Sequence, residues 1–456
     1  MVNFSVHVEE FGKIERATIE VAPFTLFIGD NNSGKSYLLT LLYGLFGEQF
    51  DKIVYNGLKN EECPHFKKVV KSFEKSINNW YYLNEDDISI IEDVLNKILA
   101  KEKDVFVKQL FKTEIPIGKI EISFPNKAIE PKIRARIIDS SVVSADDGKN
   151  EAKNSTSIET QLSDGEKGLV YRDATAKDSL KIKTAMLMYM ITKTLIPGEY
   201  RSSPIYLPAS RTGFLLTHRH LPFSKTILND VQEEPAKFDL TTPVSDFIDR
   251  MRTCTNQAKA KESSVSKFIE EKILHGTIKL DDMPQPGILY FPENSEIALP
   301  MQVSSDVVTE LVPLWLILNK SKMQINFVMN EEPEMCLHPK LQKFMAQALI
   351  RIVNAGMHVV ITTHSDIILN HVNNMIKLPN ATNRDELIEK YGYVTEDLLG
   401  KEQVQVYQFD VDTATQKTKA AGLERDNYGS FMVDTFNYAL TEMLEETDDI
   451  DCGAEG

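Results

Sequence analysis

The residues best suited to chemistry lie at Gly29–Ser36, where the sequence reads GDNNSGKS. This stretch matches the pattern G-x-x-x-x-G-K-[ST], follows the apolar run Phe24–Ile28 and precedes an apolar helical pattern. Glycines at both ends let successive backbone N–H groups turn toward a phosphate, and the start of a helix adds its positive end. Lys35 would contact the β- and γ-phosphates, and the Ser36 hydroxyl would bind Mg²⁺.

The predicted nucleotide-binding residues are therefore Gly29, Asp30, Asn31, Asn32, Ser33, Gly34, Lys35 and Ser36. A loop rich in glycine and asparagine can also match such a pattern by accident. The adjacent lysine and serine, together with the strand directly before the loop, disfavour that alternative. The sequence predicts ATP and Mg²⁺ as the ligands.

Two carboxylates follow the short apolar strand predicted at Gln324–Met329, where the chain continues NEEPE. Acidic side chains at the end of a buried strand are costly unless they bind a metal or move a proton. In a chain with a phosphate-binding loop, we expect Glu331 to support Mg²⁺ and Glu332 to polarise the attacking water. The alternative is that the same acids only form a turn and a helix cap.

His364 follows the buried strand predicted at His358–Thr362. A lone histidine is most often structural. This one stands at the carboxyl end of a core strand, where the sheets of α/β proteins bind their ligands. We therefore expect His364 to contact the γ-phosphate.

A layered α/β fold is needed to bring these groups together. Phe4–Glu9 and Ile14–Val21 alternate in the manner of half-buried strands. An apolar helix is predicted at Val303–Leu318, and Ser304 and Ser305 are suited to be its N-caps. Further expected elements are the strand Pro204–Leu207, the helix Leu341–Val353, the strand Val404–Asp410 and the helix Gly429–Leu444.

The segment Asp51–Ser202 reads as a mainly helical insertion with one strand pair. The strand pair is expected at Ile115–Phe124 and Lys132–Val143, followed by a polar loop at Asp146–Gln161 and an apolar helix at Leu180–Leu195. The insertion also carries the one basic concentration of the chain. Such a run is more often a solvated face than a nucleic-acid site. Its members are Lys101, Lys103, Lys108, Lys112, Lys119, Lys127, Lys132, Arg134 and Arg136.

Composition restricts the class of protein. With 456 residues and 42% hydrophobic residues, the chain can form a large core and two or three structural units. Its formal net charge of −16 is unlike that of a general nucleic-acid binder, so DNA contact would need a local patch. No apolar run is long enough to cross a bilayer, and the four cysteines contain no C-x-x-C pair. These features predict a cytoplasmic protein without a membrane partner.

The ordered set GDNNSGKS, SSDVVTEL, FVMNEEPEMCLHP and VITTHSD resembles the ABC-type ATPases of the RecF, SMC and OLD-like group. The segment PASR at 208–211 also resembles one seen in that group, and the similarity covers Met1–Phe50 and about Ser203–Asn370. It implies an α/β P-loop NTPase whose ABC-type ATPase head has a mixed sheet flanked by helices. The head would comprise residues 1–50 and 203–380, with an insertion at 51–202 for assembly or partner binding. Residues 381–456 would add a strand, a helix and an acidic tail.

This resemblance also implies residue roles. One subunit would supply half of a composite ATP site, made of Lys35, Ser36, Glu331, Glu332 and His364. Ser304 and Ser305 would cross a dimer and touch the γ-phosphate held by the partner subunit. The family often has glycine next, whereas this chain has Asp306, an acid that is unfavourable close to a triphosphate. The letters LSDGE at 162–166 offer a second signature candidate. Gln161 and Arg211 are the candidates for the Q-loop position.

In layout the chain most resembles the ATPase subunits of bacterial anti-phage defence systems of the Septu and PARIS kind. The resemblance implies an ATP-hydrolysing subunit that forms a homodimer or larger homo-oligomer, senses a trigger and controls a separate effector, such as a nuclease or toxin. The first alternative is a DNA-repair clamp of the RecF or SMC kind. The second is a nucleotide-gated scaffold that hydrolyses little ATP. The acidic charge predicts weak binding to plain duplex DNA.

Overall fold

The structure is a computed structural model in which the chain forms two compact units. The first comprises residues 1–12, 16–21 and 41–204, and the second residues 13–15, 22–40 and 205–456. The described residues are 4–60, 64–76, 79–125, 132–142, 153–162, 167–172, 195, 204–218, 220, 240–255, 263–281, 287–320, 326–427, 429–432 and 442–447.

The second unit contains a mixed sheet whose strands lie in the order β16-β15-β3-β14-β13-β9. Neighbouring strands from β15 to β9 run parallel, and only β16 is antiparallel to its neighbour. The central strands β3 and β14 are buried along their whole length, as expected for parallel strands covered on both faces. The strands are β3 (Phe24–Gly29), β9 (Ile205–Leu207), β13 (Phe327–Glu331), β14 (His358–Thr363), β15 (Val404–Val411) and β16 (Thr418–Gly422).

The register of this sheet brings the carboxyl ends of four strands to the same edge. Ile28 of β3 lies opposite Thr363 of β14, and Glu331 of β13 lies opposite Thr362. Asn330 of β13 lies opposite Leu207, the last residue of β9. The segments that follow β3, β9, β13 and β14 therefore leave the sheet side by side, as ligand-binding segments do in α/β proteins.

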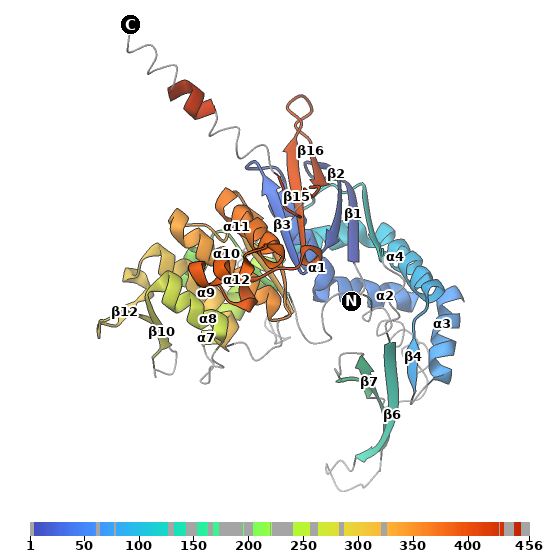
Figure 1. Ribbon diagram of the computed structural model, residues 1–456. Coiled ribbons are helices and arrows are strands. Elements are labelled where there is room, and N and C mark those ends of the chain that lie inside the picture. The colour runs from blue at the N-terminus through green and yellow to red at the C-terminus, as the bar shows by residue number, and fades with distance from the viewer. Residues whose placement is uncertain are drawn as a thin grey trace. The chain divides into compact units, whose positions relative to one another are not determined.

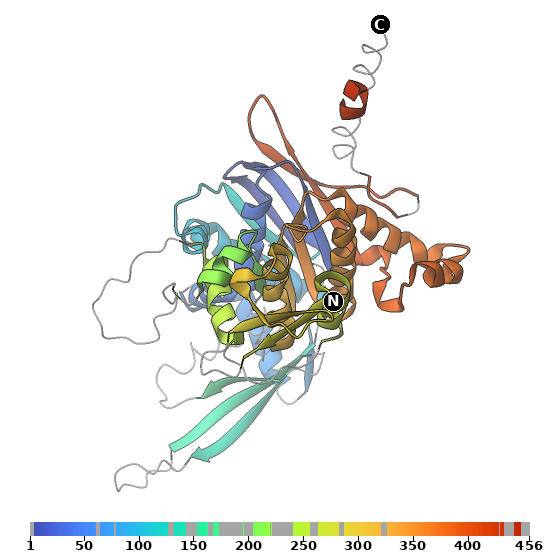
Figure 2. The same cartoon turned by 90° about the vertical axis from the view of Figure 1, so that its left-hand side faces the viewer.

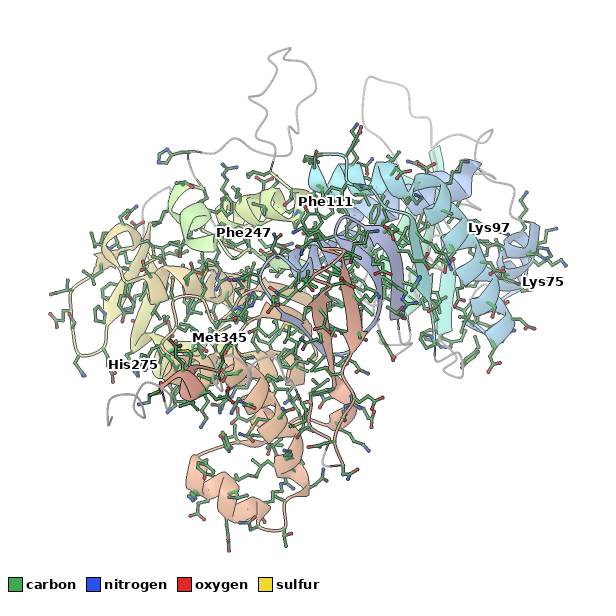
Figure 3. The ribbon with its side chains drawn as sticks, turned by 90° about the horizontal axis from the view of Figure 1, so that it is seen from above. Lys75, Lys97, Phe111, Phe247, His275 and Met345 are labelled. Carbon is green, nitrogen blue, oxygen red and sulfur yellow. The ribbon has the colours of Figure 1, made fainter. Side chains whose placement is uncertain are left out.

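Helices of the second unit pack against this sheet (Figure 1). One core cluster joins apolar side chains of β3, β13 and β14 to those of α7, α9, α10 and α11, including Phe247 and Met345 (Figure 3). A small antiparallel sheet, β10-β11-β12, belongs to the same unit. These elements are α6 (Arg211–Thr217), α7 (Thr242–Thr255), α8 (Ser264–Ile269), α9 (Asp306–Lys320), α10 (Pro339–Asn354), α11 (Asp366–Lys377), α12 (Arg384–Tyr391), β10 (Gly276–Leu280), β11 (Ile288–Pro292) and β12 (Leu299–Pro300).

The first unit contains the strand set β5-β1-β2 and a four-stranded antiparallel sheet, β4-β6-β7-β8, whose long β6 and β7 form a ribbon (Figure 2). The long helix α4 begins with a capping box between Asn84 and Asp87, and its C-cap Lys112 has the left-handed conformation. The elements are β1 (Phe4–Phe11), β2 (Ile14–Val21), α1 (Lys35–Phe46, which begins in the second unit), α2 (Glu48–Asn60), α3 (Pro64–Lys75), β4 (Trp80–Tyr82), α4 (Glu85–Phe111), β5 (Lys119–Ser123), β6 (Lys132–Val142), β7 (Lys153–Leu162) and β8 (Lys167–Arg172).

The α/β fold class with a large mixed sheet flanked by helices is confirmed. Within residues 51–202, two predictions are wrong. The strands expected at Ile115–Phe124 and Lys132–Val143 do not pair with each other, because β5 pairs with β1 while β6 pairs with β4 and β7. The expected loop Asp146–Gln161 contains most of β7. Ile158 is the one apolar residue of β7 within that stretch, so apolar alternation does not mark the strand.

Other predictions fall on residues outside the description. These are the helix Leu180–Leu195 apart from Leu195, the letters at 163–166, and most of the helix Gly429–Leu444 and of the acidic tail. For the described residues 429–432 the prediction of a helix is wrong, because Phe431 forms an isolated β-bridge with Arg425. The predicted domain limits stay predictions. Among the described residues, no helix combines the length and apolar character needed to span a bilayer.

Candidate functional site

The Gly29–Ser36 loop joins the last residue of β3 to the first turn of α1. Gly29 has φ 132° and Gly34 has φ 94°, and a Cβ at Gly29 would lie 2.5 Å from the carbonyl oxygen of Phe409. Only glycine fits such a position, because any side chain would collide with backbone there. The loop therefore has the tight curvature that a phosphate cradle needs.

Lys35 is the buried cation of this loop, with 5% of its surface exposed. Its Nζ donates to the carbonyl oxygens of Gly29 at 2.8 Å and Asp30 at 2.6 Å, and lies 3.3 Å from the Ser33 hydroxyl. Burial lowers the pKa of Lys35 to about 8, although attraction to Glu332, among other acids, opposes this shift. The ammonium group therefore binds neutral carbonyl oxygens of its own loop, which an anionic ligand could replace.

The remaining loop residues divide into two classes. Asp30, Asn31, Asn32 and Ser36 are exposed, whereas Ser33 is buried with 1% of its surface accessible. Ser36 lies in the first turn of α1, where its hydroxyl is accessible to a cation and the helix start favours negative charge.

Glu331 is the last residue of β13 and Glu332 follows it, and their contacts differ. The Glu331 Oε2 accepts a hydrogen bond from the Ala209 amide at 3.0 Å, which ties the end of β13 to the segment after β9. Glu332 has φ 43°, an uncommon left-handed value for this residue type, and its amide donates to the carbonyl of Thr362 at 2.9 Å. Such strain is found where a side chain must be held in one particular direction.

His364 faces Glu332 across this edge of the sheet. The His364 Nε2 lies 3.9 Å from the Glu332 Oε1, and the two side chains are 31% and 37% exposed. Burial and the nearby Lys35 lower the pKa of His364, while Glu332 opposes that shift. At neutral pH the imidazole is therefore mostly uncharged and has one ring nitrogen to donate and one to accept.

Glu334 is a site residue that the sequence reading did not single out. Its Oε1 accepts a hydrogen bond from the His364 amide at 2.7 Å, while its buried Oε2 has no partner among the described residues. Burial raises the pKa of this carboxyl group, against the hydrogen bond from His364. The third acid of NEEPE thus positions the backbone of the segment that carries His364. The only sequence signal was its spacing of two residues from Glu332.

Arg211, one of the two Q-loop candidates, is almost fully buried, with 2% of its surface exposed. Its guanidinium donates to the carbonyl oxygens of Glu331 at 2.8 Å and Glu332 at 3.2 Å, and its Nε lies 2.7 Å from the Glu310 Oε2. The side chain therefore holds the backbone of Glu331, the predicted Mg²⁺ ligand, and of Glu332, the predicted base. The other candidate, Gln161, belongs to β7 in the first unit, and its side chain lies outside the description.

The predicted signature residues lie at the start of α9. The Ser304 hydroxyl donates to the carbonyl of Pro300 at 3.1 Å, and the carbonyl of Ser305 accepts from the amides of Val308 and Thr309. Asp306 is in the first turn of α9, where an acid interacts favourably with the helix dipole. Of the LSDGE letters, only Leu162 is described, at the end of β7.

The residues present fit a magnesium–nucleotide complex. Among the described residues, no three His, Cys, Asp or Glu side chains converge into a metal cage. Mg²⁺ does not require one, since it usually retains waters and uses phosphate oxygens with one or two protein ligands. Ser36 and Glu331 offer two such oxygen ligands. The close packing at Gly29 leaves room for backbone N–H groups and none for a side chain.

Comparison with known families matches the AAA ATPase domain family to residues 2–369, more than half of the chain. That span includes Lys35, Glu331, Glu332, Glu334 and His364. No curated protein matches the sequence significantly.

Solved structures similar to the chain include three SMC heads. The SMC head domain from Thermotoga maritima is 10% identical, with a TM-score of 0.35, covering 93% of this chain and 100% of that one. A SmcHead bound to the C-winged helix domain of ScpA is 11% identical, with a TM-score of 0.38 over 93% and 98%. An Smc head bound to the C-terminal domain of ScpA derived from Pyrococcus furiosus is 10% identical, with a TM-score of 0.36 over 98% and 99%. TM-scores below 0.5 are too low to add to the family match.

Proposed function

Because the chain belongs to the AAA ATPase domain family, we propose that it binds ATP at Gly29–Ser36 and hydrolyses it to ADP and phosphate. The observation that carries this proposal is the common sheet edge, where the register of β3, β13 and β14 gathers Lys35, Glu332 and His364. Lys35 is a cation that can bind phosphate, and Glu332 is a carboxylate that can accept a proton. His364 is a neutral imidazole that can donate a hydrogen bond to a phosphate oxygen.

In the proposed reaction, Lys35 exchanges the carbonyls of Gly29 and Asp30 for the β- and γ-phosphates. Glu332 orients a water and accepts its proton as the oxygen attacks the γ-phosphorus and the bond to the β-phosphate oxygen breaks. His364 donates a hydrogen bond to a γ-phosphate oxygen. Bound Mg²⁺ would neutralise phosphate charge, with Ser36 and Glu331 as its protein ligands.

The test is ATP turnover by the purified full chain. We expect phosphate release from the wild type and none from Lys35→Ala, with nucleotide binding lost in the same variant. Lys419→Ala is the matched control, because Lys419 is an exposed lysine of β16 that lies 3.5 Å from Glu15. Equal turnover by wild type and Lys35→Ala would refute the assignment of the loop.

We further propose that two copies close on ATP, with Ser304 and Ser305 contributed in trans. In support, Ser305 is exposed directly before α9, so it is available to a second subunit. Ser305→Arg should block ATP-driven dimerisation, measured by light scattering, and spare binding of a fluorescent ATP analogue. Thr413→Arg, on the exposed β15–β16 turn, is the control. An undisturbed Ser305→Arg dimer would refute the role in trans.

At the level of biology, we propose a cytoplasmic subunit of an anti-phage defence complex that controls a separate effector protein. The charge distribution supports this function over a DNA clamp. In the described part of the basic run, Lys108 lies 2.7 Å from Glu114, and Lys119 lies 2.9 Å from Glu121. Lysines paired with carboxylates are poor phosphate ligands, because DNA would have to displace the acids.

Co-expression with the neighbouring gene separates the two functions. The defence proposal expects a protein that co-purifies with the chain, and linear duplex binding on the order of micromolar or weaker at physiological salt. A clamp instead requires ATP-dependent duplex binding that is far tighter and falls steeply with salt. Tight binding of that kind by the chain alone, without a co-purifying protein, would overturn the defence proposal.

A further inference from the structure

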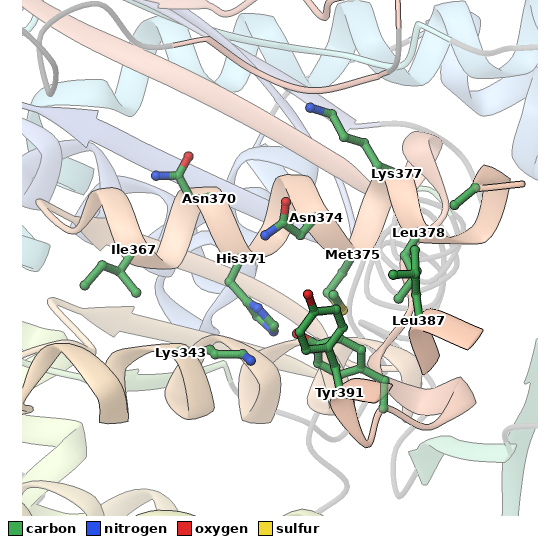
Figure 4. A pocket seen from close by; sticks show the side chains of 12 residues that line it. Lys343, Ile367, Asn370, His371, Asn374, Met375, Lys377, Leu378, Leu387 and Tyr391 are labelled. Carbon is green, nitrogen blue, oxygen red and sulfur yellow. The ribbon is translucent and has the colours of Figure 1, made fainter. Parts of the chain in front are cut away.

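A pocket of about 570 Å³ lies between α10, α11 and α12 in the second unit (Figure 4). This volume is in the range of small-molecule sites. Its lining combines cationic, amide, imidazole and phenol groups with a few apolar side chains. The polar members on which the argument rests are Lys343, Asn370, His371, Asn374, Tyr391 and Tyr393.

Lys343 extends from α10 into this pocket without a carboxylate partner. Its Nζ lies 5.2 Å from the ring centre of Tyr393 and 6.0 Å from that of Tyr391. Within the described chain, no acidic oxygen lies within 4.0 Å of this ammonium group. Aromatic faces stabilise a cation but leave its charge uncompensated, so the pocket attracts an anion.

His371, on the opposite wall, carries a second unsatisfied group. Its side chain is 4% exposed, and its buried Nε2 has no hydrogen-bond partner among the described residues. Figure 4 shows the imidazole extending from α11 toward Lys343 and Tyr391. Burial and Lys343 lower its pKa to about 4, so the ring is neutral at pH 7. A buried polar atom without a partner costs free energy, which a bound ligand would recover.

The rim supplies the means to recognise a planar ring. Asn370 and Asn374 are exposed on α11 at a spacing of four residues, which places them on one face of the helix. Each amide offers two donors and a carbonyl acceptor, the groups that pair with the edge of a heterocycle. Tyr391, 52% exposed, adds an aromatic surface at the same opening.

We propose that this pocket binds a small anion carrying a planar heterocycle, a nucleoside monophosphate in chemical class, as a second ligand distinct from the ATP of the Gly29–Ser36 loop. Lys343 binds the phosphate, His371 bonds to the body of the ligand, and the two asparagines read the edge of the ring. A protein partner fits less well, because the groups that lack partners lie inside the pocket and Tyr391 is the one large apolar lining residue that is strongly exposed.

The two helices that form the walls also begin at the proposed catalytic edge. α11 starts directly after His364, with Ser365 as its N-cap, and α10 starts five residues after Glu334. The Ser365 hydroxyl donates to the Gln342 Oε1 at 2.6 Å, which joins the two helix starts. A ligand held between α10 and α11 therefore acts on the position of His364 and changes the rate of ATP hydrolysis; this coupling rests on the proposed function.

Binding is tested in full-length Lys35→Ala protein, which removes competition from the first nucleotide site. The probes are AMP, GMP, CMP and UMP, measured by calorimetry. We expect saturable binding of at least one probe, at least tenfold weaker binding by Lys343→Gln in the same background, and a change below twofold for Lys340→Gln. Lys340 is an exposed residue of the same helix outside the pocket, so it controls for charge.

The absence of saturable binding by all four probes, or equal binding by Lys343→Gln, would overturn the pocket assignment. Binding is read in a background without the first nucleotide site, so its failure is distinguishable from failure of the proposed ATPase. The coupling is tested in chains with an intact loop, where the bound probe should change turnover by at least twofold in the wild type and not in Lys343→Gln. Unchanged wild-type turnover would overturn the coupling.

Discussion

Two pairs of ionisable groups lie beside the end of β13, and they differ in distance and in exposure. The Arg211 Nε and Glu310 Oε2 are 2.7 Å apart, and the two side chains are 2% and 5% exposed. The His364 Nε2 and Glu332 Oε1 are 3.9 Å apart, and those side chains are 31% and 37% exposed. The first pair (the closed pair) is short and buried, whereas the second (the open pair) is partly exposed and too long for a direct hydrogen bond.

The buried pair acts through the backbone. Besides Glu310, the guanidinium binds the carbonyl oxygens of Pro208, Glu331 and Glu332, so it fixes the segments after β9 and β13 together. Thr212 adds a 2.6 Å hydrogen bond to Glu310 Oε1. Among the described residues, the side chains of Glu332 and His364 have no comparable set of hydrogen-bond partners. The difference suggests two separate roles: the buried ion pair holds the backbone in place, and the partly exposed groups remain accessible to a ligand.

Glu332→Gln breaks the open pair and should have the largest effect on rate. Hydrolysis should fall by about 10²–10⁴-fold, because the amide cannot accept the proton, while ATP binding remains. The free energy of unfolding should change by less than about 0.5 kcal/mol, since the side chain is partly exposed. Phosphate release and chemical denaturation measure the two effects, with exposed Glu296→Gln as the control. Wild-type turnover by Glu332→Gln would refute its role as base.

Arg211→Met breaks the closed pair and should mainly affect stability. We expect a loss of about 3–5 kcal/mol in the free energy of unfolding, because Glu310 is left as a buried unpaired charge. Lys419→Met, which removes an exposed pair, should cost less than about 1 kcal/mol. Urea denaturation followed by circular dichroism measures both variants.

The double variant Arg211→Met/Glu310→Met sharpens this test. Removing both charges should recover part of the loss, but the carbonyls of Glu331 and Glu332 remain without their donor. A single-variant loss as small as that of Lys419→Met would contradict the framing role of Arg211.

The open pair was predictable from the sequence and the closed pair was not. Glu332 and His364 each follow an apolar run that reads as a core strand, and parallel strand ends necessarily meet at one edge. Arg211 stands in a segment with no periodic signal, and its partner Glu310 is about a hundred residues away. Long-range burial of a charge leaves no local pattern, so Arg211 could be proposed only by resemblance and for another role.

Glu334 shows a second limit of sequence reading. The acids of NEEPE are alike in chemistry, and only the turn after β13, with Glu332 at φ 43°, decides which one lies under His364. Strand β7 shows a third limit, because a polar alternating strand resembles a loop in composition. The central strands were predictable since burial on both faces requires continuous apolar residues.

Glu334→Ala tests whether Glu334 holds the backbone of His364 in position. Loss of the acceptor for the His364 amide should lower turnover by roughly tenfold, the effect of one hydrogen bond to a charged group, with nucleotide affinity nearly unchanged. Glu334→Gln keeps an acceptor oxygen and should restore most of the rate. Equal defects in both variants would indicate that the negative charge, and not the position of the amide, is what matters.

The smallest expected effect concerns pH and the burial of Lys35. Its pKa falls to about 8 in the folded chain from an ordinary 10.5, so between these values the unfolded chain binds more protons at this site. The contribution of Lys35 to stability therefore rises with pH across that window. A bound triphosphate favours the charged ammonium, so binding above pH 8 must take up a proton, and affinity should fall by at most tenfold per pH unit.

Calorimetry in two buffers with different heats of ionisation measures this proton uptake directly. At pH 9 the folded chain has mostly neutral Lys35, so binding of an ATP analogue should take up about one proton per site, and far less at pH 7. Burial and Lys35 lower the pKa of His364 from its ordinary value, so uptake at pH 9 is assigned to Lys35. Equal proton uptake at both pH values would show that Lys35 keeps its charge despite burial. Glu332 and His364 would then lie near a Lys35 that stays protonated throughout this pH range. In that case Lys35 would resemble Arg211, a buried cation that keeps its charge.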